Sequence, residues 1–336
     1  MKIIETGQLY PLKFRPVYME RLWGGDMLSG VLHRELPEHE NPIGESWDLA
    51  DRDEVSSVVF NGALAGATLH ELVVAYRASL LGTRADGAER FPLIVKIIDA
   101  GERLSLQVHP DELACRDLGG GAEPKTEMWY VLAAKSGAKI FAGLDGRATR
   151  IQLLDMIDSP DIERLMQVYH SSPCDAYYIA AGTLHAIGAG NLILEIQQNS
   201  DTTYRMNDWG RLGPDGKPRT LHKEQAIRSV NFTNRTNPRV PSAVGTRNFN
   251  RKFDVVKLCP FFQVADLRLH STWNDDTGAG ESFHLLSAVR NRVRVGRDDR
   301  TAEIIPGETL LIPACFGPYE ITPLDPGEAT VVRTTL

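Results

Sequence analysis

The chain has 336 residues, 42% hydrophobic and 24% charged, a balance typical of a globular protein with one large or two ordinary domains. Its 37 basic and 44 acidic side chains leave a net charge of −7 without a basic run, which argues against a nucleic-acid or anionic-membrane partner. No apolar run is long enough for a transmembrane span, the first eleven residues lack the apolar core of a signal peptide, and the four cysteines form no C-x-x-C pair. We therefore expect a cytoplasmic protein with reduced thiols.

A helix is predicted over residues 68–82. Thr68 and Glu71 make a capping box, apolar residues recur at helical spacing after it, and Gly82 provides a stop. Residues 91–98 follow as an almost wholly apolar strand that contains Lys96. A lysine inside such a run needs an anionic partner or an opening into a cavity, so Lys96 is a candidate functional residue.

The next strand, residues 104–109, alternates between apolar and polar side chains. In a strand of period two, its three polar side chains share one face. Because residues 91–98 are expected to be buried on both sides, we expect this polar face to line an interior cavity rather than to meet water. The three polar residues are Ser105, Gln107 and His109.

Helices and strands then alternate up to residue 169. A short helix is expected over 111–118, and 127–132 and 138–142 are expected to be paired strands. Residues 149–169 carry apolar side chains at helical spacing, broken at Ser159-Pro160, which predicts a two-helix insertion without visible chemistry.

Strands resume at 175–179, and a histidine flanked by glycines, His185, comes next. The strand at 191–198 carries Glu195, and Asp201 and Arg205 follow it. Residues 233–249, rich in Asn, Arg, Thr and Pro, are the best domain boundary, and short strands without helices occupy the rest. We therefore expect two domains, 1–235 and 236–336.

Two imidazoles, a carboxylate and an amide on neighbouring strands suit a divalent first-row metal such as zinc. The candidate ligands are Gln107, His109, Glu127 and His185. The alternative interpretation is that both histidines are ordinary buried residues with backbone partners. Three further cations, Lys96, Lys125 and Arg205, indicate an anionic substrate such as a phosphate or a carboxylate.

Four motifs in order give the chain a resemblance to the type I mannose-6-phosphate isomerases, in their shorter bacterial branch. They are Leu-Ser-Leu-Gln-Val-His-Pro-Asp at 104–111, Pro-Lys-Thr-Glu-Met at 124–128, Gly-Thr-Leu-His-Ala at 182–186, and Glu195 followed by Asp201 and Arg205. Gly-Glu-Ser-Trp at 44–47 fits the same family. The chain has Thr126 where the family carries proline in the second motif, a departure that leaves Glu127 in place.

The resemblance implies a mainly β fold: two cupin (jelly-roll) β-barrels with a helical insertion in the N-terminal part. It also implies one Zn²⁺ per chain and reversible conversion of mannose 6-phosphate to fructose 6-phosphate through a cis-enediol. The C-terminal barrel is expected to be metal-free on its own residues, because it has His270 and His284 but no Gln-x-His pair and no glutamate like Glu127. Carried over by position, the zinc ligands are Gln107, His109, Glu127 and His185, with water as the alternative to Gln107.

The same resemblance gives Arg205 as the active-site arginine and places Glu195, Asp201 and Lys125 in the pocket. We expect zinc and Arg205 to stabilise the enediolate charge, and either Glu195 or Lys125 to move the proton. Lys96 and Ser105 are expected to lie towards the phosphate.

Two alternatives are another metal-cupin enzyme, such as an Fe²⁺ dioxygenase, and a sugar-binding bicupin without turnover. The surplus cations argue against the first, and the presence of every ligand and of Arg205 argues against the second. The oligomeric state is open at this point.

Overall fold

The computed structural model describes residues 3–213, 216–234, 236–241, 248–278 and 280–336. The fold is mainly β, as predicted, and the chain divides into two compact units. Unit 1 comprises residues 1–17, 47–96 and 242–336, and unit 2 comprises residues 18–46 and 97–241. Among the described residues, no helix has the length and apolar character needed to cross a membrane.

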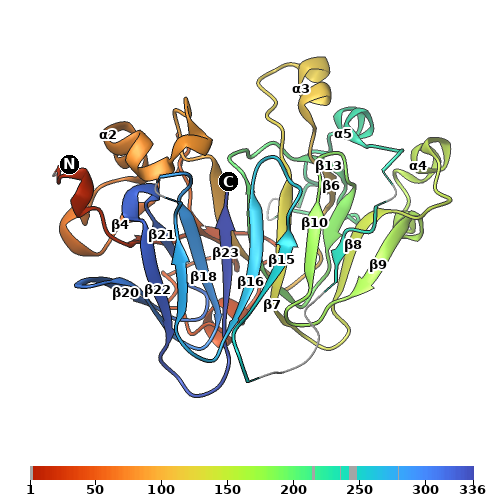
Figure 1. Cartoon of the computed structure of the whole chain (residues 1–336). Coiled ribbons are helices and arrows are strands. Elements are labelled where there is room, and N and C mark those ends of the chain that lie inside the picture. The colour runs from red at the N-terminus through yellow and green to blue at the C-terminus, as the bar shows by residue number, and fades with distance from the viewer. Residues whose placement is uncertain (1–2, 214–215, 235, 242–247, 279) are drawn as a thin grey trace. The chain divides into compact units, whose positions relative to one another are not determined.

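Unit 1 contains two antiparallel sheets (Figure 1). The seven-stranded sheet runs β15 (Arg251–Val256), β16 (Gln263–Leu269), β23 (Ala329–Thr335), β18 (His284–Arg290), β21 (Thr309–Ile312), β1 (Leu12–Arg15) and β4 (Val58–Val59). The four-stranded sheet runs β17 (Trp273–Asp276), β22 (Pro318–Pro323), β19 (Val293–Arg297) and β20 (Arg300–Ile304). Buried apolar side chains from both sheets form one cluster, so the sheets pack face to face as a sandwich.

The helix predicted at 68–82 is confirmed as α2 (Leu69–Leu81) in unit 1. The side chain of Thr68 accepts a hydrogen bond from the backbone N–H of Glu71, and the carboxylate of Glu71 accepts one from the backbone N–H of Thr68, which completes the capping box. Gly82 ends the helix with φ +85°, and a Cβ there would lie 2.5 Å from the carbonyl oxygen of Glu281. Only glycine fits this position. Short 3₁₀ turns complete the unit: η1 (Thr6–Gln8), η2 (Gly62–Leu64), η3 (Thr83–Ala85) and η5 (Ala314–Phe316).

The two units do not follow the contiguous division expected at residues 235 and 236. Residues 1–17 and 47–96 belong with 242–336, because β1 pairs with β21 through Leu12 and Leu311, and β4 pairs with β1. In Figure 1 the red and orange N-terminal segment, with α2, accordingly lies beside the blue strands β21 and β22. The expected linker, 233–249, falls partly outside the described residues.

Unit 2 also contains two sheets, and the division between the units passes through three of their strands, β2, β3 and β5. The seven-stranded sheet runs β14 (Arg239–Val240), β10 (Ala176–Ile179), β7 (Glu127–Ala134), β12 (Asn191–Gln198), β5 (Leu93–Ala100), β3 (Ile43–Leu49) and β2 (Val17–Glu20). The five-stranded sheet runs β13 (Tyr204–Asn207), β6 (Leu106–Val108), β11 (His185–Ile187), β8 (Lys139–Leu144) and β9 (Met166–His170). The helices are α1 (Met27–Gly30), α3 (Glu112–Leu118), α4 (Arg150–Met156) and α5 (Lys223–Ser229), with the 3₁₀ turn η4 (Ile162–Leu165).

Two expectations for unit 2 are corrected. The insertion at 149–169 contains one helix, α4, and one 3₁₀ turn, while residues from Met166 onward form β9 because they pair with β8. The strands expected to pair with each other, β7 and β8, lie in different sheets: β7 pairs with β10 and β12, and β8 with β9 and β11.

Two apolar clusters flank the five-stranded sheet of unit 2. One combines its side chains with those of the seven-stranded sheet, including Trp129, Ile140 and Ile187. The other contains Leu106 and Val108 of β6 with residues of α4 and α5. The alternating polar residues of β6 therefore point away from the helices, towards the seven-stranded sheet.

Candidate metal centre and active site

A row of three predicted site residues crosses the five-stranded sheet of unit 2. Arg205 on β13 lies opposite Gln107 on β6, and Gln107 lies opposite His185 on β11. Directly opposed residues of antiparallel strands project from the same face, so all three share the polar face predicted for β6. Ser105 and His109, which flank this strand, are buried at 4% and 1% exposure. Gln107 between them is partly exposed, so the polar face is largely buried, and the predicted interior cavity stays a prediction.

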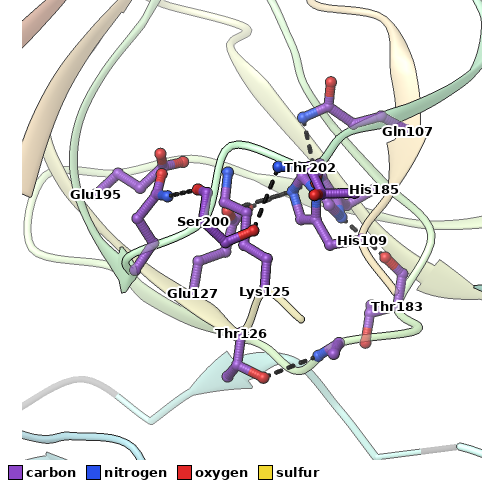
Figure 2. A network of polar contacts seen from close by, with 12 residues as sticks. Gln107, His109, Lys125, Thr126, Glu127, Thr183, His185, Glu195, Ser200 and Thr202 are labelled. Carbon is purple, nitrogen blue, oxygen red and sulfur yellow. Dashed lines mark hydrogen bonds and ion pairs between the residues drawn. The ribbon is translucent and has the colours of Figure 1, made fainter. Parts of the chain in front are cut away.

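Glu127 joins this group from the first position of β7, in the other sheet of unit 2. Ligand atoms of His109, Glu127 and His185 all lie within 4.8 Å of one another, and all three residues are buried. The Nε2 atom of His109 lies 3.3 Å from Oε2 of Glu127, and Nε2 of His185 lies 3.5 Å from Oε1. Figure 2 shows His109 and His185 side by side, with Glu127 and Lys125 next to them.

Backbone carbonyls fix the orientation of both imidazoles. The Nδ1–H of His109 donates to the carbonyl oxygen of Thr202 at 2.9 Å, and that of His185 donates to Thr183 at 2.8 Å. Each ring therefore presents an unprotonated Nε2 towards Glu127. Burial lowers the pKa of His185 to about 3 and also lowers the pKa of His109, assisted by the charge of Lys125. Both rings are neutral, the form that binds metals.

The residues present fit a divalent metal. Nε2 of His109 and Oε1 of Glu127 are buried without a hydrogen-bond partner among the described residues, whereas Oε2 of Glu127 is paired with a lysine ammonium. Buried polar atoms in this state are costly unless a ligand satisfies them. Two nitrogens and a carboxylate oxygen suit zinc.

Gln107 lies beside this trio as a fourth donor. Its amide nitrogen is 3.3 Å from Nε2 of His185, and its Oε1 accepts a hydrogen bond from the hydroxyl of Ser105 at 3.2 Å. A half-turn of the amide would place Oε1 beside the imidazole instead, so Gln107 is in reach of the same metal.

Lys125 supplies the positive charge of the site. Its ammonium lies 3.0 Å from Oε2 of Glu127, and the side chain is buried. Burial by itself would lower the pKa of Lys125, but the carboxylates of Glu127, Glu195 and Asp201 outweigh it and raise that pKa above its ordinary value. The amine stays protonated at neutral pH, which suits charge stabilisation rather than proton abstraction.

Glu195 lies on the same face of the seven-stranded sheet as Glu127. It is 4% exposed, and its Oε2 accepts a hydrogen bond from the indole N–H of Trp129 at 2.9 Å. Asp201, beyond the end of β12, is exposed. Of the two proton carriers predicted, Lys125 is held as an ammonium, so the role of Glu195 as the base stays a prediction.

Arg205 and Lys96 differ in how the structure places them. Arg205 donates from Nη1 to the carbonyl oxygen of Thr220 at 2.9 Å, while its Nε is buried without a partner among the described residues. Burial, with the neighbouring charge of Arg219, lowers the pKa of Arg205. Lys96 belongs to unit 1, where its ammonium lies 4.0 Å from the ring centroid of Trp47, so its part in the site stays a prediction.

Sequence reasoning did not find three groups that orient the side chains of the site: the carbonyls of Thr202 and Thr183, and the side chain of Trp129. Backbone carbonyls leave no residue-type signal. Trp129 did leave one, because it is two positions from Glu127 on a strand and must share its face.

Comparisons with known proteins indicate the family of the chain. The sequence model of the phosphomannose isomerase type I catalytic domain matches residues 11–141. The mannose-6-phosphate isomerase ManA of Bacillus subtilis is 33% identical over 319 residues, which cover 93% of this chain and 95% of that protein. The mannose-6-phosphate isomerase of Streptococcus mutans is 32% identical over 90% of this chain and 92% of its own.

The fold of the chain is also similar to that of a solved structure. The mannose 6-phosphate isomerase of B. subtilis superposes with a TM-score of 0.85 at 30% identity, covering 98% of this chain and 100% of that one. Both the sequence and the fold thus match over nearly the whole length. The chain belongs to the type I phosphomannose isomerase family, a family of aldose–ketose isomerases.

Proposed function

We propose that this protein interconverts mannose 6-phosphate and fructose 6-phosphate, with one zinc ion held by His109, Glu127 and His185, and with Gln107 or water completing the coordination. The observation that carries the proposal is the buried trio of His109, Glu127 and His185, in which Nε2 of His109 and Oε1 of Glu127 have no hydrogen-bond partner among the described residues, set beside a protonated lysine. A cytoplasmic location is part of the proposal, supported by four free thiols among the described residues.

The reaction moves a proton between C2 and C1 through a cis-enediol, so it needs a base, a proton relay between O1 and O2, and a positive environment for the enediolate. Bound zinc would supply Lewis-acid stabilisation of that negative charge. Glu195 acts as the base, because its carboxylate is buried beside the site and Lys125 is held as an ammonium.

Besides zinc, Lys125 and Arg205 supply positive charge that stabilises the enediolate. The ammonium of Lys125 is buried and fixed by Glu127, so it is aligned before substrate binds. Arg205 shares the face of Gln107 and His185, and its unpartnered Nε is available to an oxyanion. Asp201 at the rim, and Lys96 with Ser105 towards the phosphate, complete the proposed substrate contacts.

A coupled assay tests the proposal. Purified protein loaded with zinc is given mannose 6-phosphate, and fructose 6-phosphate formation is followed, with glucose 6-phosphate as the control substrate. We expect turnover of mannose 6-phosphate and little of the glucose epimer. Tight sugar-phosphate binding without turnover would favour the non-catalytic bicupin, and an oxygen-consuming reaction with Fe²⁺ would favour another metal-cupin enzyme.

A further inference from the structure

One buried tryptophan contacts both the carboxylate proposed as the base and one of the proposed metal ligands. Trp129 lies on β7, two residues after Glu127, and is 1% exposed. Its direct neighbour across one side of the sheet is Glu195 on β12, and its neighbour on the other side is Tyr177 on β10. Glu127, Trp129 and Glu195 therefore project from one face of the sheet.

The tryptophan makes two specific contacts on that face. Its indole N–H donates to Oε2 of Glu195 at 2.9 Å. Its ring meets the imidazole of His185 edge-on, with the ring centroids 5.2 Å apart and the planes at 80°. A single rigid side chain thus contacts the carboxylate proposed as base and one of the proposed metal ligands.

Packing alone does not account for a tryptophan here. Trp129 belongs to an apolar cluster with Val131 and Ile140, and a phenylalanine or a leucine would also fill such a position. Tryptophan differs from them by its N–H donor, which must find an acceptor when buried. In this structure that acceptor is Glu195, and the hydrogen bond is buried.

We propose that Trp129 is a positioning residue, which sets the orientation of the Glu195 carboxylate relative to the metal ligand His185. The inference rests on the proposed function, in which Glu195 is the base that takes up the substrate proton. A carboxylate rotates freely about its own torsions, whereas the indole is fixed by the core around it. A donor held in this way restricts the carboxylate to one orientation, and misplacement of a reacting group by 1 Å can cost as much as about 100-fold in rate.

Two substitutions isolate the N–H from the ring. Trp129→Phe keeps an aromatic ring against His185 and removes the donor. Incorporation of benzothienylalanine at position 129 replaces the N–H by sulfur in a bicycle of nearly the same shape, so folding is preserved if phenylalanine leaves too large a cavity. For both variants we expect kcat to fall by roughly 10- to 100-fold, with KM and zinc content within about twofold of the wild type, because neither depends on the carboxylate's orientation.

Tyr177→Phe is the matched control. Tyr177 is buried directly opposite Trp129, and its hydroxyl has no hydrogen-bond partner among the described residues. Its removal changes a polar group in the same apolar cluster without touching Glu195. We expect kcat, KM and zinc content to stay at wild-type values, and a loss of kcat equal to that of Trp129→Phe would overturn the inference.

A double-mutant cycle separates positioning from a merely structural role. If Trp129 acts through Glu195, Trp129→Phe should have no further effect on kcat in a Glu195→Gln background. Additive losses would contradict the inference, and so would a wild-type kcat in Trp129→Phe. If Glu195→Gln is inactive while both position-129 variants turn over normally, the inference fails and the proposed function stands. A fully active Glu195→Gln enzyme would contradict both the assignment of Glu195 as the base and the positioning role of Trp129.

Discussion

At the scale of single residues, the metal site depends on two imidazoles that differ from other buried histidines by having an unprotonated nitrogen aimed at a carboxylate. His284 in unit 1 is the contrast: it is also buried, but its Nδ1 pairs with the hydroxyl of Tyr319 at 2.6 Å. His185 pairs with a backbone carbonyl and faces Glu127. Burial alone therefore does not distinguish the proposed ligands from His284, whereas the partners of the ring nitrogens do.

Substitution of the two histidines tests this distinction. We expect His185→Ala to weaken zinc binding by roughly 100-fold or more, since even partners outside the coordination shell contribute 10- to 100-fold. His284→Ala, which also removes a buried imidazole, should destabilise the fold but leave the zinc content per folded chain unchanged. Elemental analysis of refolded, dialysed protein measures both. Equal zinc content in the two variants would show that His185 is not a ligand.

The assignment of the base is tested by exchange of the C2 proton with tritiated solvent. Glu195→Gln should lose this exchange, because the amide cannot accept the proton. Lys125→Met should lower the overall rate but retain measurable exchange, since the ammonium stabilises charge and does not abstract the proton. Exchange at the wild-type rate in Glu195→Gln would show that another group is the base.

The sequence predicted the side chains of the site more completely than their supports. Alternation in β6 identified Ser105, Gln107 and His109, because period two fixes which side chains share a face. The carbonyl of Thr202, which orients His109, lies 93 residues away in sequence and has no side-chain signal. Such contacts depend on how strands associate, which local patterns do not encode.

At the scale of elements, helix α2 was predicted well because its stabilising features are local. Both hydrogen bonds of its capping box lie between Thr68 and Glu71, three residues apart. The strand β9 was mistaken for helix because its sequence, from Met166, continues an apolar helical spacing. Its pairing with β8 overrides that propensity.

Removal of the cap tests this account of α2. Thr68→Ala should lower the free energy of unfolding by about 1 kcal/mol, because the N–H of Glu71 loses its acceptor, and Thr68→Ser should retain most of the stability. Urea denaturation with tryptophan fluorescence measures both. Thr149→Ala, which removes the equivalent cap of α4, is a comparison in unit 2. An unchanged midpoint for Thr68→Ala would show that the cap contributes nothing in the folded protein.

At the scale of the whole molecule, the mainly β class was predictable and the division into units was not. Short strands separated by turns are visible in sequence, but the pairing of Leu12 with Leu311 spans almost the entire chain. Composition placed a boundary near residue 235, close to the last of the four crossings between the units, and could not show that the N-terminal residues belong to unit 1. The two cupin barrels and the metal-free character of the second remain predictions.

A metal titration of the intact protein tests the central claim most directly. The chain is stripped of metal with a chelator, dialysed, and titrated with Zn²⁺ while conversion of mannose 6-phosphate to fructose 6-phosphate is measured. We expect no turnover at the start, a linear rise, and a break at one zinc per chain, with a parallel increase in Tm because the metal binds the folded state. Full activity in protein shown to be metal-free would contradict the account.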